Sequence, residues 1–200
     1  MRPTADGLVA DVIALWDALG IEQSHFVGLS MGGTTGLGIA TNHGARLASL
    51  IACDCRCDGD AAFRAAWEPR IELARDQGMA ALAAPTTDRW FTDAFKTSRP
   101  DVIGEVQEMI RTTSAAGFIG CANALQTVDY RAGLGDIKTP TLFISGAQDP
   151  AATPDYITAM TEQMPGCQFV VVDPAGHISN LENPDQFNRA MVDFLTAQEA

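Results

Sequence analysis

The chain has 200 residues, of which 25 are Asp or Glu and 13 are Lys or Arg, so its formal net charge is −12. This acid excess argues against a nucleic-acid-binding protein, because phosphate contacts require a basic surface. No apolar run reaches the roughly 18 residues of a membrane span, and the N-terminus lacks the pattern of a signal peptide. Five cysteines, an odd number, are more typical of reduced thiols than of a disulfide framework. We therefore expect a soluble, cytoplasmic protein with no membrane or nucleic-acid partner.

Short apolar runs alternate with helical patterns in the first quarter of the chain. Residues 5–19 carry an apolar stripe at helical spacing, with Thr4 as a candidate N-cap and Gly20 at the helix end. The elements expected next are a strand at 25–29, a glycine-rich helix at 31–42 and a strand at 48–53.

The pattern changes between residues 58 and 131, where helical segments with aromatic residues follow one another and no strand-like run occurs. This stretch also holds eight of the 13 basic residues, namely Arg64, Arg70, Arg75, Arg89, Lys96, Arg99, Arg111 and Arg131. After it we expect strands at 141–145 and 168–172 and helices at 154–164 and 184–197. Buried apolar strands that alternate with helices predict an α/β fold with a mostly parallel sheet. In this interpretation residues 1–57 and 132–200 form the core, and residues 58–131 form a helical cap.

The segment Gly28-Leu29-Ser30-Met31-Gly32 matches the pattern G-x-S-x-G. Its serine falls between a short strand and a glycine-rich helix, as a nucleophile elbow requires. Glycines on both sides permit a strained turn and a close approach of neighbouring backbone. The turn would present the Ser30 hydroxyl at a helix N-terminus, with the backbone N–H of Met31 facing a developing oxyanion. The alternative is a tight strand–helix turn in which Ser30 only caps the helix.

A serine hydroxyl needs a base within hydrogen-bond reach to act as a nucleophile. His177 is the strongest candidate, because its loop follows the 168–172 strand and would lie at the carboxyl edge of the sheet. His25 and His43 are better explained as a surface and a helix-end histidine.

The base in turn needs an acid that fixes its tautomer. Asp149, just after the 141–145 strand, is well placed for this role, and Asp173 is its competitor or a turn former before Pro174. The chain order Ser30, Asp149, His177 is the order found in α/β-hydrolases.

The sequence resembles the α/β-hydrolase superfamily over essentially its whole length, and within it the 3-oxoadipate enol-lactonases. The superfamily resemblance lies in Val27-Gly28-Leu29-Ser30-Met31-Gly32-Gly33 and in Ala175-Gly176-His177-Ile178-Ser179-Asn180-Leu181-Glu182. The lactonase resemblance lies in Arg89-Trp90-Phe91-Thr92 and Trp67-Glu68-Pro69-Arg70-Ile71. It implies that Ser30 is the nucleophile, His177 the general base and Asp149 the orienting acid, with no cofactor.

The resemblance also implies a substrate, 3-oxoadipate enol-lactone in the catabolism of aromatic compounds, opened through an acyl-enzyme. That substrate carries a carboxylate, which an acidic core would repel, so we hypothesise that a cap arginine offsets the repulsion. Trp67 and Trp90 are candidates for lining the substrate pocket, with ordinary cap packing as the alternative. Two other functions stay open: a related carboxylesterase or arylesterase, and, from another class, a truncated inactive remnant or binding module.

The run Cys53-Asp54-Cys55-Arg56-Cys57 invites a metal-binding interpretation. If the segment were extended, alternation would put all three sulfurs on one side. Tetrahedral zinc sites, however, favour wider spacing and distant partners. We therefore expect a strand end with buried thiols and no metal.

Only 29 residues precede Ser30, so the strands that come before the elbow in the family have no counterpart here. The loop that donates the second oxyanion N–H is also missing, and losing one such donor typically costs roughly 10²–10³ in turnover. We further expect an exposed apolar edge at residues 25–29. The chain is thus expected to be a natural fragment or to have a start that was set too late.

Overall fold

The computed structural model describes residues 3–198, and its centre is a sheet of four parallel strands in the order β1-β2-β3-β4. The strands are β1 (Ser24–Leu29), β2 (Leu47–Cys53), β3 (Thr141–Gly146) and β4 (Gln168–Val172). Every residue of β3 is buried, which is why its sequence is apolar on consecutive positions. Within the described residues β1 pairs only with β2, and the Val27 side of this edge strand is exposed.

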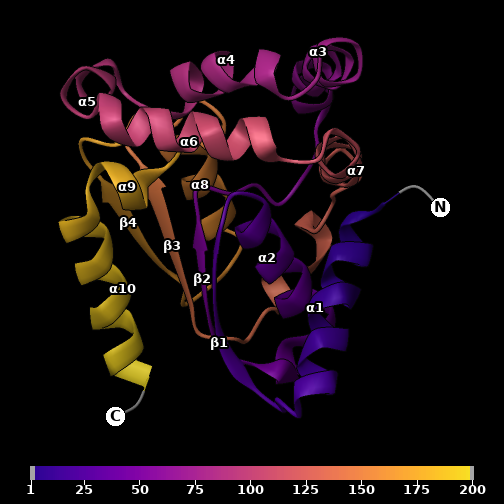
Figure 1. The fold of residues 1–200 in the computed structure, drawn as a ribbon. Helices are drawn as coiled ribbons and strands as arrows, with labels where there is room; N and C mark the ends of the chain where they lie inside the picture. The colour runs from indigo at the N-terminus through magenta and orange to yellow at the C-terminus, as the bar shows by residue number, and fades with distance from the viewer. Residues whose placement is uncertain (1–2, 199–200) are drawn as a thin grey trace.

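Helices cover both faces of the sheet (Figure 1). One face carries α1 (Ala5–Leu19), α2 (Met31–His43) and α8 (Pro154–Thr161), and the other face carries α10 (Pro184–Gln198). Helix α2 lies very close to the sheet, because a Cβ at Gly36 would sit only 2.5 Å from the Cδ1 of Leu50. Gly33, Gly36 and Gly38 weaken this segment as a helix, and they also allow it to pack closely against its neighbours.

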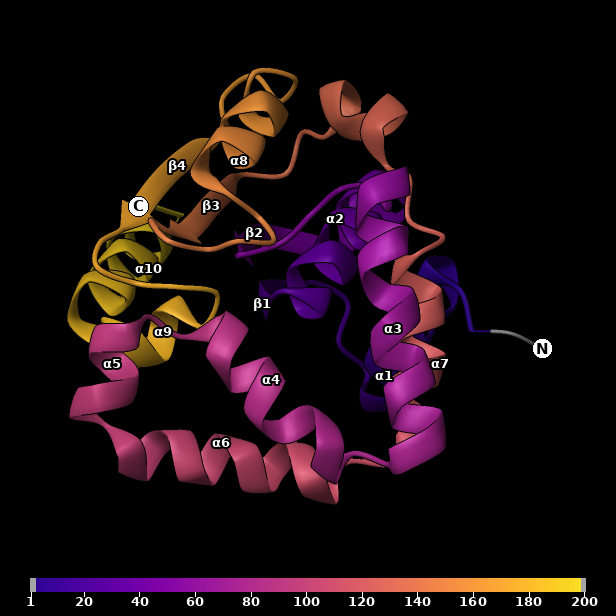
Figure 2. The ribbon, with the colours of Figure 1, turned by 90° about the horizontal axis from the view of Figure 1, so that it is seen from above.

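Five helices lie between β2 and β3 in the chain and stand beyond the carboxyl ends of the strands (Figures 1 and 2). They are α3 (Ala61–Gln77), α4 (Ala80–Trp90), α5 (Asp93–Ser98), α6 (Pro100–Thr112) and α7 (Ala115–Leu125), and we call them the cap helices. They have a hydrophobic core of their own around Leu82, Phe91 and Ile110. The two chain segments that lead into and out of the cap helices meet at an antiparallel bridge between Asp58 and Asp129.

Three short helical elements complete the chain: η1 (Gly44–Arg46), η2 (Arg131–Asp136) and α9 (Ser179–Glu182). The sequence did not predict them. None of the helices within residues 3–198 is long and apolar enough to cross a bilayer.

The helices and strands expected from the sequence are present, and most of their ends coincide with the expected residues or differ by one. The largest difference is the helix expected at 154–164, which ends at Thr161 as α8. The N–H of Met164 already bonds to the carbonyl of Thr161, three residues back, and Pro165 disfavours a helical conformation in the residue before it. The apolar stripe continues past the point where the backbone can remain helical.

Cys53, Cys55 and Cys57 are buried at a strand end, as expected, but the segment is not extended and their thiols do not share one side of the sheet. The strand ends at Cys53, and the next residue, Asp54, has a positive φ of 48°. This turn breaks the alternation of an extended chain. Cys53 therefore packs in the core on the α10 face, and the other two thiols pack in the core on the α1 and α2 face.

Candidate active site

Ser30 occupies a strained turn between β1 and α2. Its φ is 54°, a left-handed conformation that a residue with a side chain rarely adopts. The turn is tight, because a Cβ at Gly28 would lie 2.3 Å from the backbone carbon of Gly32. Ser30 makes no side-chain capping hydrogen bond to α2, so the alternative in which it only caps the helix is wrong.

The structure brings Ser30, His177 and Asp149 together from three loops at the carboxyl edge of the sheet. The Ser30 Oγ lies 2.9 Å from Nε2 of His177, and Nδ1 of His177 lies 2.8 Å from Oδ2 of Asp149. Both His177 and Asp149 are buried. With its proton on Nδ1, the imidazole donates to the carboxylate and accepts from the serine hydroxyl, which is the arrangement that makes serine a nucleophile.

The orientation of Asp149 is set by its own loop, since its second carboxylate oxygen accepts a hydrogen bond of 2.7 Å from the N–H of Ala151. The competitor Asp173 is exposed and bonds to the side chain of Gln148. His25 bonds to Ser49 on the neighbouring strand, and His43 ends α2. These three residues therefore stay outside the triad arrangement.

The loop of His177 is attached to the cap helices through α4 and α5. The N–H of His177 donates to the carbonyl of Trp90 over 2.8 Å. Gly176 is required there, because a Cβ would lie 2.5 Å from the same carbonyl oxygen. The Glu182 carboxylate accepts from the N–H of Gly176 and from the backbone and hydroxyl of Thr92.

Asp54 is a buried acid next to the triad that sequence reasoning missed. Its Oδ1 accepts from the N–H of Gly146 over 2.7 Å and its Oδ2 from the hydroxyl of Ser179 over 2.5 Å. Burial raises the pKa of the Asp54 carboxyl from 3.8 to about 7, with a smaller contribution from the charge of Asp149, against the lowering effect of its two hydrogen bonds. The sequence feature that could have indicated Asp54 is its position directly after a strand, because Asp149 also follows a strand.

A cavity of about 380 Å³ lies between the triad and the cap helices, a size typical of small-molecule sites. Its wall includes Ser30 and His177 from the core. The predicted residues Trp67 and Trp90 also line it, together with Arg70 and Arg89 of the cap helices.

The two cap arginines carry positive charge into this cavity. Burial and, to a smaller extent, the charge of Arg70 together lower the pKa of Arg89 to about 10. Burial also lowers the pKa of Arg70. Neither guanidinium forms an ion pair with an acid among residues 3–198. Beside them the indole N–H of Trp67 is buried and has no partner within the described chain. The cavity thus offers a free indole N–H and two guanidinium groups that have no ion-pair partner within residues 3–198.

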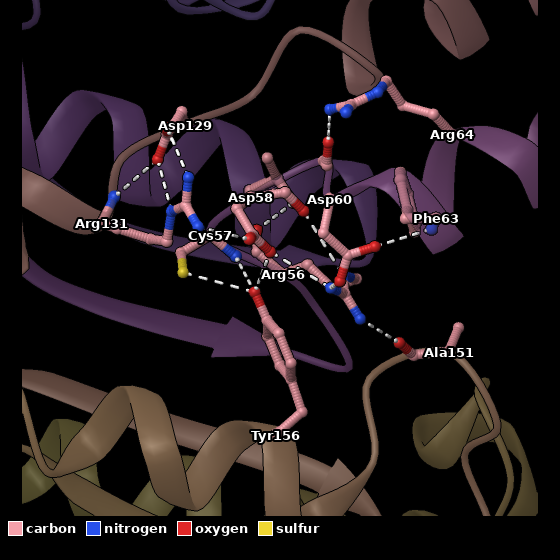
Figure 3. A network of polar contacts seen from close by, with 12 residues as sticks. Arg56, Cys57, Asp58, Asp60, Phe63, Arg64, Asp129, Arg131, Ala151 and Tyr156 are labelled. Atoms are coloured by element: carbon pink, nitrogen blue, oxygen red, sulfur yellow. Dashed lines mark hydrogen bonds and ion pairs between the residues drawn. The ribbon is translucent and has the colours of Figure 1, made fainter.

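Arg56 connects the loop of the acid to the start of the cap helices, as Figure 3 shows. Its guanidinium donates to the carbonyl of Ala151 over 3.3 Å and to the carboxylate of Asp60, the N-cap of α3, over 2.6 Å. It also stacks on the ring of Tyr156, with 3.9 Å between the guanidinium carbon and the ring centre. Arg56 therefore joins three segments at the wall of the cavity, which Arg56 and Ala151 themselves line.

Comparison with known proteins agrees with this geometry. A profile described as "Alpha/beta hydrolase family" matches residues 2–190. The chain belongs to the alpha/beta hydrolase family. This membership confirms the predicted fold class of a parallel sheet flanked by helices.

Relatives within the alpha/beta hydrolase family include 3-oxoadipate enol-lactonase 2 of Acinetobacter baylyi, which is 37% identical over 187 residues. That match spans 93% of this chain and 68% of the relative. The enol-lactonase from Burkholderia xenovorans LB400 has a similar structure, with a TM-score of 0.93, 36% identity and coverage of 98% of this chain and 74% of that chain. A thermophilic esterase from Thermogutta terrifontis also has a similar structure, with a TM-score of 0.92 and 27% identity. That match covers 100% of this chain and 75% of the esterase chain.

In alpha/beta hydrolases the oxyanion hole uses the backbone N–H of the residue after the nucleophile, together with an N–H from an earlier loop. Met31 is that following residue here and is the first residue of α2. The first N–H groups of a helix have no partner within the helix, and the helix dipole makes this end favourable for negative charge. Met31 thus meets the local requirement for the first donor.

Proposed function

We propose that this chain is a serine hydrolase that opens a small lactone, 3-oxoadipate enol-lactone, through a Ser30–His177–Asp149 triad. The observation that carries the proposal is the continuous hydrogen-bond chain from the Ser30 hydroxyl through the imidazole to the carboxylate, at 2.9 and 2.8 Å. No cofactor is required for this chemistry, and the partner of the chain is the small-molecule substrate.

In the first half of the reaction, Ser30 Oγ attacks the lactone carbonyl carbon while its proton moves to Nε2 of His177. The Met31 N–H donates to the carbonyl oxygen as negative charge develops there. The tetrahedral intermediate then collapses, the ring C–O bond breaks, and the imidazolium returns its proton to the leaving oxygen. The released enol stays attached through the acyl chain, as an ester of Ser30.

In the second half, His177 removes a proton from water as the water oxygen attacks the acyl carbon. The C–O bond to Ser30 breaks, and the serine oxygen regains its proton from the imidazolium. Asp149 remains ionised throughout and stabilises the imidazolium in each half. The products are a free carboxylate and the restored enzyme.

Two observations support the enol-lactone over a neutral ester. Relatives with enol-lactonase names are 34–37% identical over nearly the whole chain. In addition, the charges of Arg70 and Arg89 and the free indole N–H of Trp67 suit a carboxylate in the cavity. The substrate's own carboxylate would then be bound by the cap helices while its lactone carbonyl faces Ser30.

A related carboxylesterase is the second candidate. It is favoured by the likeness to the Thermogutta terrifontis esterase and by the apolar residues that also line the cavity, such as Leu82 and Ile110. The two candidates share the triad and differ only in the group that the cap helices bind.

The test is active-site labelling followed by a substrate comparison. A serine-directed fluorophosphonate should label the protein, and Ser30→Ala should abolish labelling; an unlabelled native chain would favour an inactive remnant or a binding module. Hydrolysis of the enol-lactone should then exceed that of simple aryl esters in kcat/KM. Hydrolysis of aryl esters with no activity on the lactone would defeat the lactonase proposal and retain the esterase.

A further inference from the structure

We propose that Asp54 is a positioning residue of this site: its carboxylate holds the acid loop and the histidine loop together, and its charge stabilises the imidazolium of His177. The proposal rests on the proposed serine hydrolase function. It adds a second buried carboxylate to the triad, with a role that differs from that of Asp149.

Asp54 lies between the two loops that it would hold. It follows the last residue of β2, and its own N–H bonds to the carbonyl of Ile144 on β3. One carboxylate oxygen accepts from the N–H of Gly146, at the start of the loop that carries Asp149. The other accepts from the hydroxyl of Ser179, two residues after His177. One side chain thus links the loops of the acid and the base.

The backbone of Asp54 is strained in a way that favours this placement. Its φ of 48° is a left-handed conformation, and Asp54 and Ser30 are the non-glycine residues with positive φ within residues 3–198. Such conformations are energetically unfavourable for residues with a side chain and are concentrated at functional sites. Here the turn directs the carboxylate inward, where its residue is only 1% exposed.

The charged groups that act on Asp54 are Asp149 and His177. Asp149 repels its negative charge, and His177 attracts it. The neighbouring thiols of Cys53 and Cys55 have strongly raised pKa values because they are buried, so they remain neutral. His177 is therefore the cationic partner of Asp54 that arises during the reaction, when the serine proton moves to Nε2.

The proposed role of Asp54 predicts how activity depends on pH. Because burial raises the pKa of Asp54 to about 7, the carboxylate is charged above neutral pH and protonated below it. The charged form favours the imidazolium and therefore the transition state that contains it. Activity should consequently fall at low pH for two reasons, protonation of His177 and protonation of Asp54.

Asp54→Asn is the decisive variant, because it retains the shape and removes the charge. The amide oxygen can still accept from Gly146, and the amide nitrogen can donate to the Ser179 oxygen. We expect kcat to fall about tenfold with KM changed less than twofold. The acid limb of the kcat/KM profile should move to lower pH, because the imidazolium loses its stabilising anion.

Ser179→Ala should move the acid limb of the kcat/KM profile to higher pH. Removing the hydroxyl takes away a hydrogen bond that favours the charged carboxylate, so Asp54 would ionise only at higher pH. The matched control is Asp173→Asn, which removes an exposed carboxylate four residues before His177 and should leave the limb unchanged.

A second readout does not depend on catalysis. The imidazole of His177 can be titrated by NMR and assigned with His177→Gln, and its midpoint should move to lower pH in Asp54→Asn. An unchanged midpoint together with an unchanged acid limb would overturn the proposal. If the native chain hydrolyses nothing while the midpoint still shifts, the coupling of Asp54 to His177 stands and the proposed hydrolase function fails. If Asp54→Asn does not fold, Ser179→Ala is the test. An acid limb of the kcat/KM profile that does not move in Ser179→Ala would then overturn the proposal.

Discussion

The Glu182 carboxylate accepts hydrogen bonds from both the backbone N–H and the hydroxyl of Thr92, at 3.1 and 2.7 Å. Thr92 is the N-cap of α5, and Glu182 ends α9, five residues after His177. The same carboxylate also accepts from Gly176. The cap helices and the loop of the base are therefore fixed to one acidic side chain.

Glu182→Ala should lower both stability and turnover. Removing the acceptor leaves the N–H groups of Gly176 and Thr92 without their partner, at a cost of about 1–3 kcal/mol for each buried group. Urea unfolding should show the loss, and kcat should fall more than KM rises, because the histidine loop is displaced. Glu162→Ala, at an exposed position, is the control; equal unfolding free energies for the two variants would contradict the prediction.

His177→Ala should abolish hydrolysis and leave the fold largely intact. The variant removes the base and its bonds to Ser30 and Asp149, and loss of a triad member typically lowers turnover by about 10³-fold or more. Steady-state hydrolysis and far-UV circular dichroism measure the two effects. A folded variant that retained full activity would refute the assignment of His177 as base.

Arg70→Gln and Arg89→Gln should each weaken the binding of an anionic substrate. We expect KM for the enol-lactone to rise roughly 10- to 100-fold in each variant, since a charge-assisted bond to a carboxylate is worth about 1.5–3 kcal/mol. KM for a neutral aryl ester should change less than twofold. Arg75→Gln, on the exposed side of the same helix as Arg70, controls for a general charge effect. Equal changes for both substrates would argue against a carboxylate site.

The stability of the protein should depend on pH through Asp54. Its pKa is raised from 3.8 to about 7 in the folded state, so between pH 4 and pH 7 the folded chain holds a proton that the unfolded chain has released. Raising the pH through this interval therefore lowers the unfolding free energy. In Asp54→Asn this loss is absent, so the stability of the variant relative to the native chain should increase from pH 4.5 to 7.5. The prediction would be contradicted if urea unfolding gave the same difference in unfolding free energy between Asp54→Asn and the native chain at every pH in this range.

Two glycines of α2 should respond oppositely to alanine. At Gly36 a Cβ would meet Leu50 at 2.5 Å, so Gly36→Ala should destabilise the fold by about 1–3 kcal/mol through overpacking. At Gly32 a Cβ meets nothing within 4 Å, so Gly32→Ala should stabilise by up to about 1 kcal/mol through helix propensity. Thermal unfolding of both variants measures the difference, and equal shifts in Tm would count against the close packing of α2.

The two central strands of the sheet, β2 and β3, could be predicted because they are buried on both faces. That burial makes them short apolar runs in the sequence, as in β3. The three triad residues could be predicted as a set because each follows such a run and parallel strands end at one edge. The end of α8 was missed since the apolar stripe continues beyond Thr161, where proline stops the backbone.

The surroundings of the triad could not be predicted, because they depend on distances between elements. Asp54 stands in a cysteine-rich run, and nothing local indicates that its carboxylate reaches Gly146 and Ser179. The sequence likewise offered eight basic residues in the 58–131 region, and only the fold distinguishes Arg70 and Arg89, which line the cavity.

The chain segments that enter and leave the cap helices lie side by side and are joined by two backbone hydrogen bonds. The N–H of Gly59 donates to the carbonyl of Val128, and the N–H of Tyr130 donates to the carbonyl of Cys57. A short linker could therefore replace everything between them without pulling the sheet apart. Recombination at this crossing would exchange the cap helices and their cavity-lining residues as a unit, and it would also remove the Trp90 and Thr92 contacts of the His177 loop. A replacement of the cap helices would therefore leave the sheet intact, but it would have to supply new partners for the N–H of His177 and the carboxylate of Glu182.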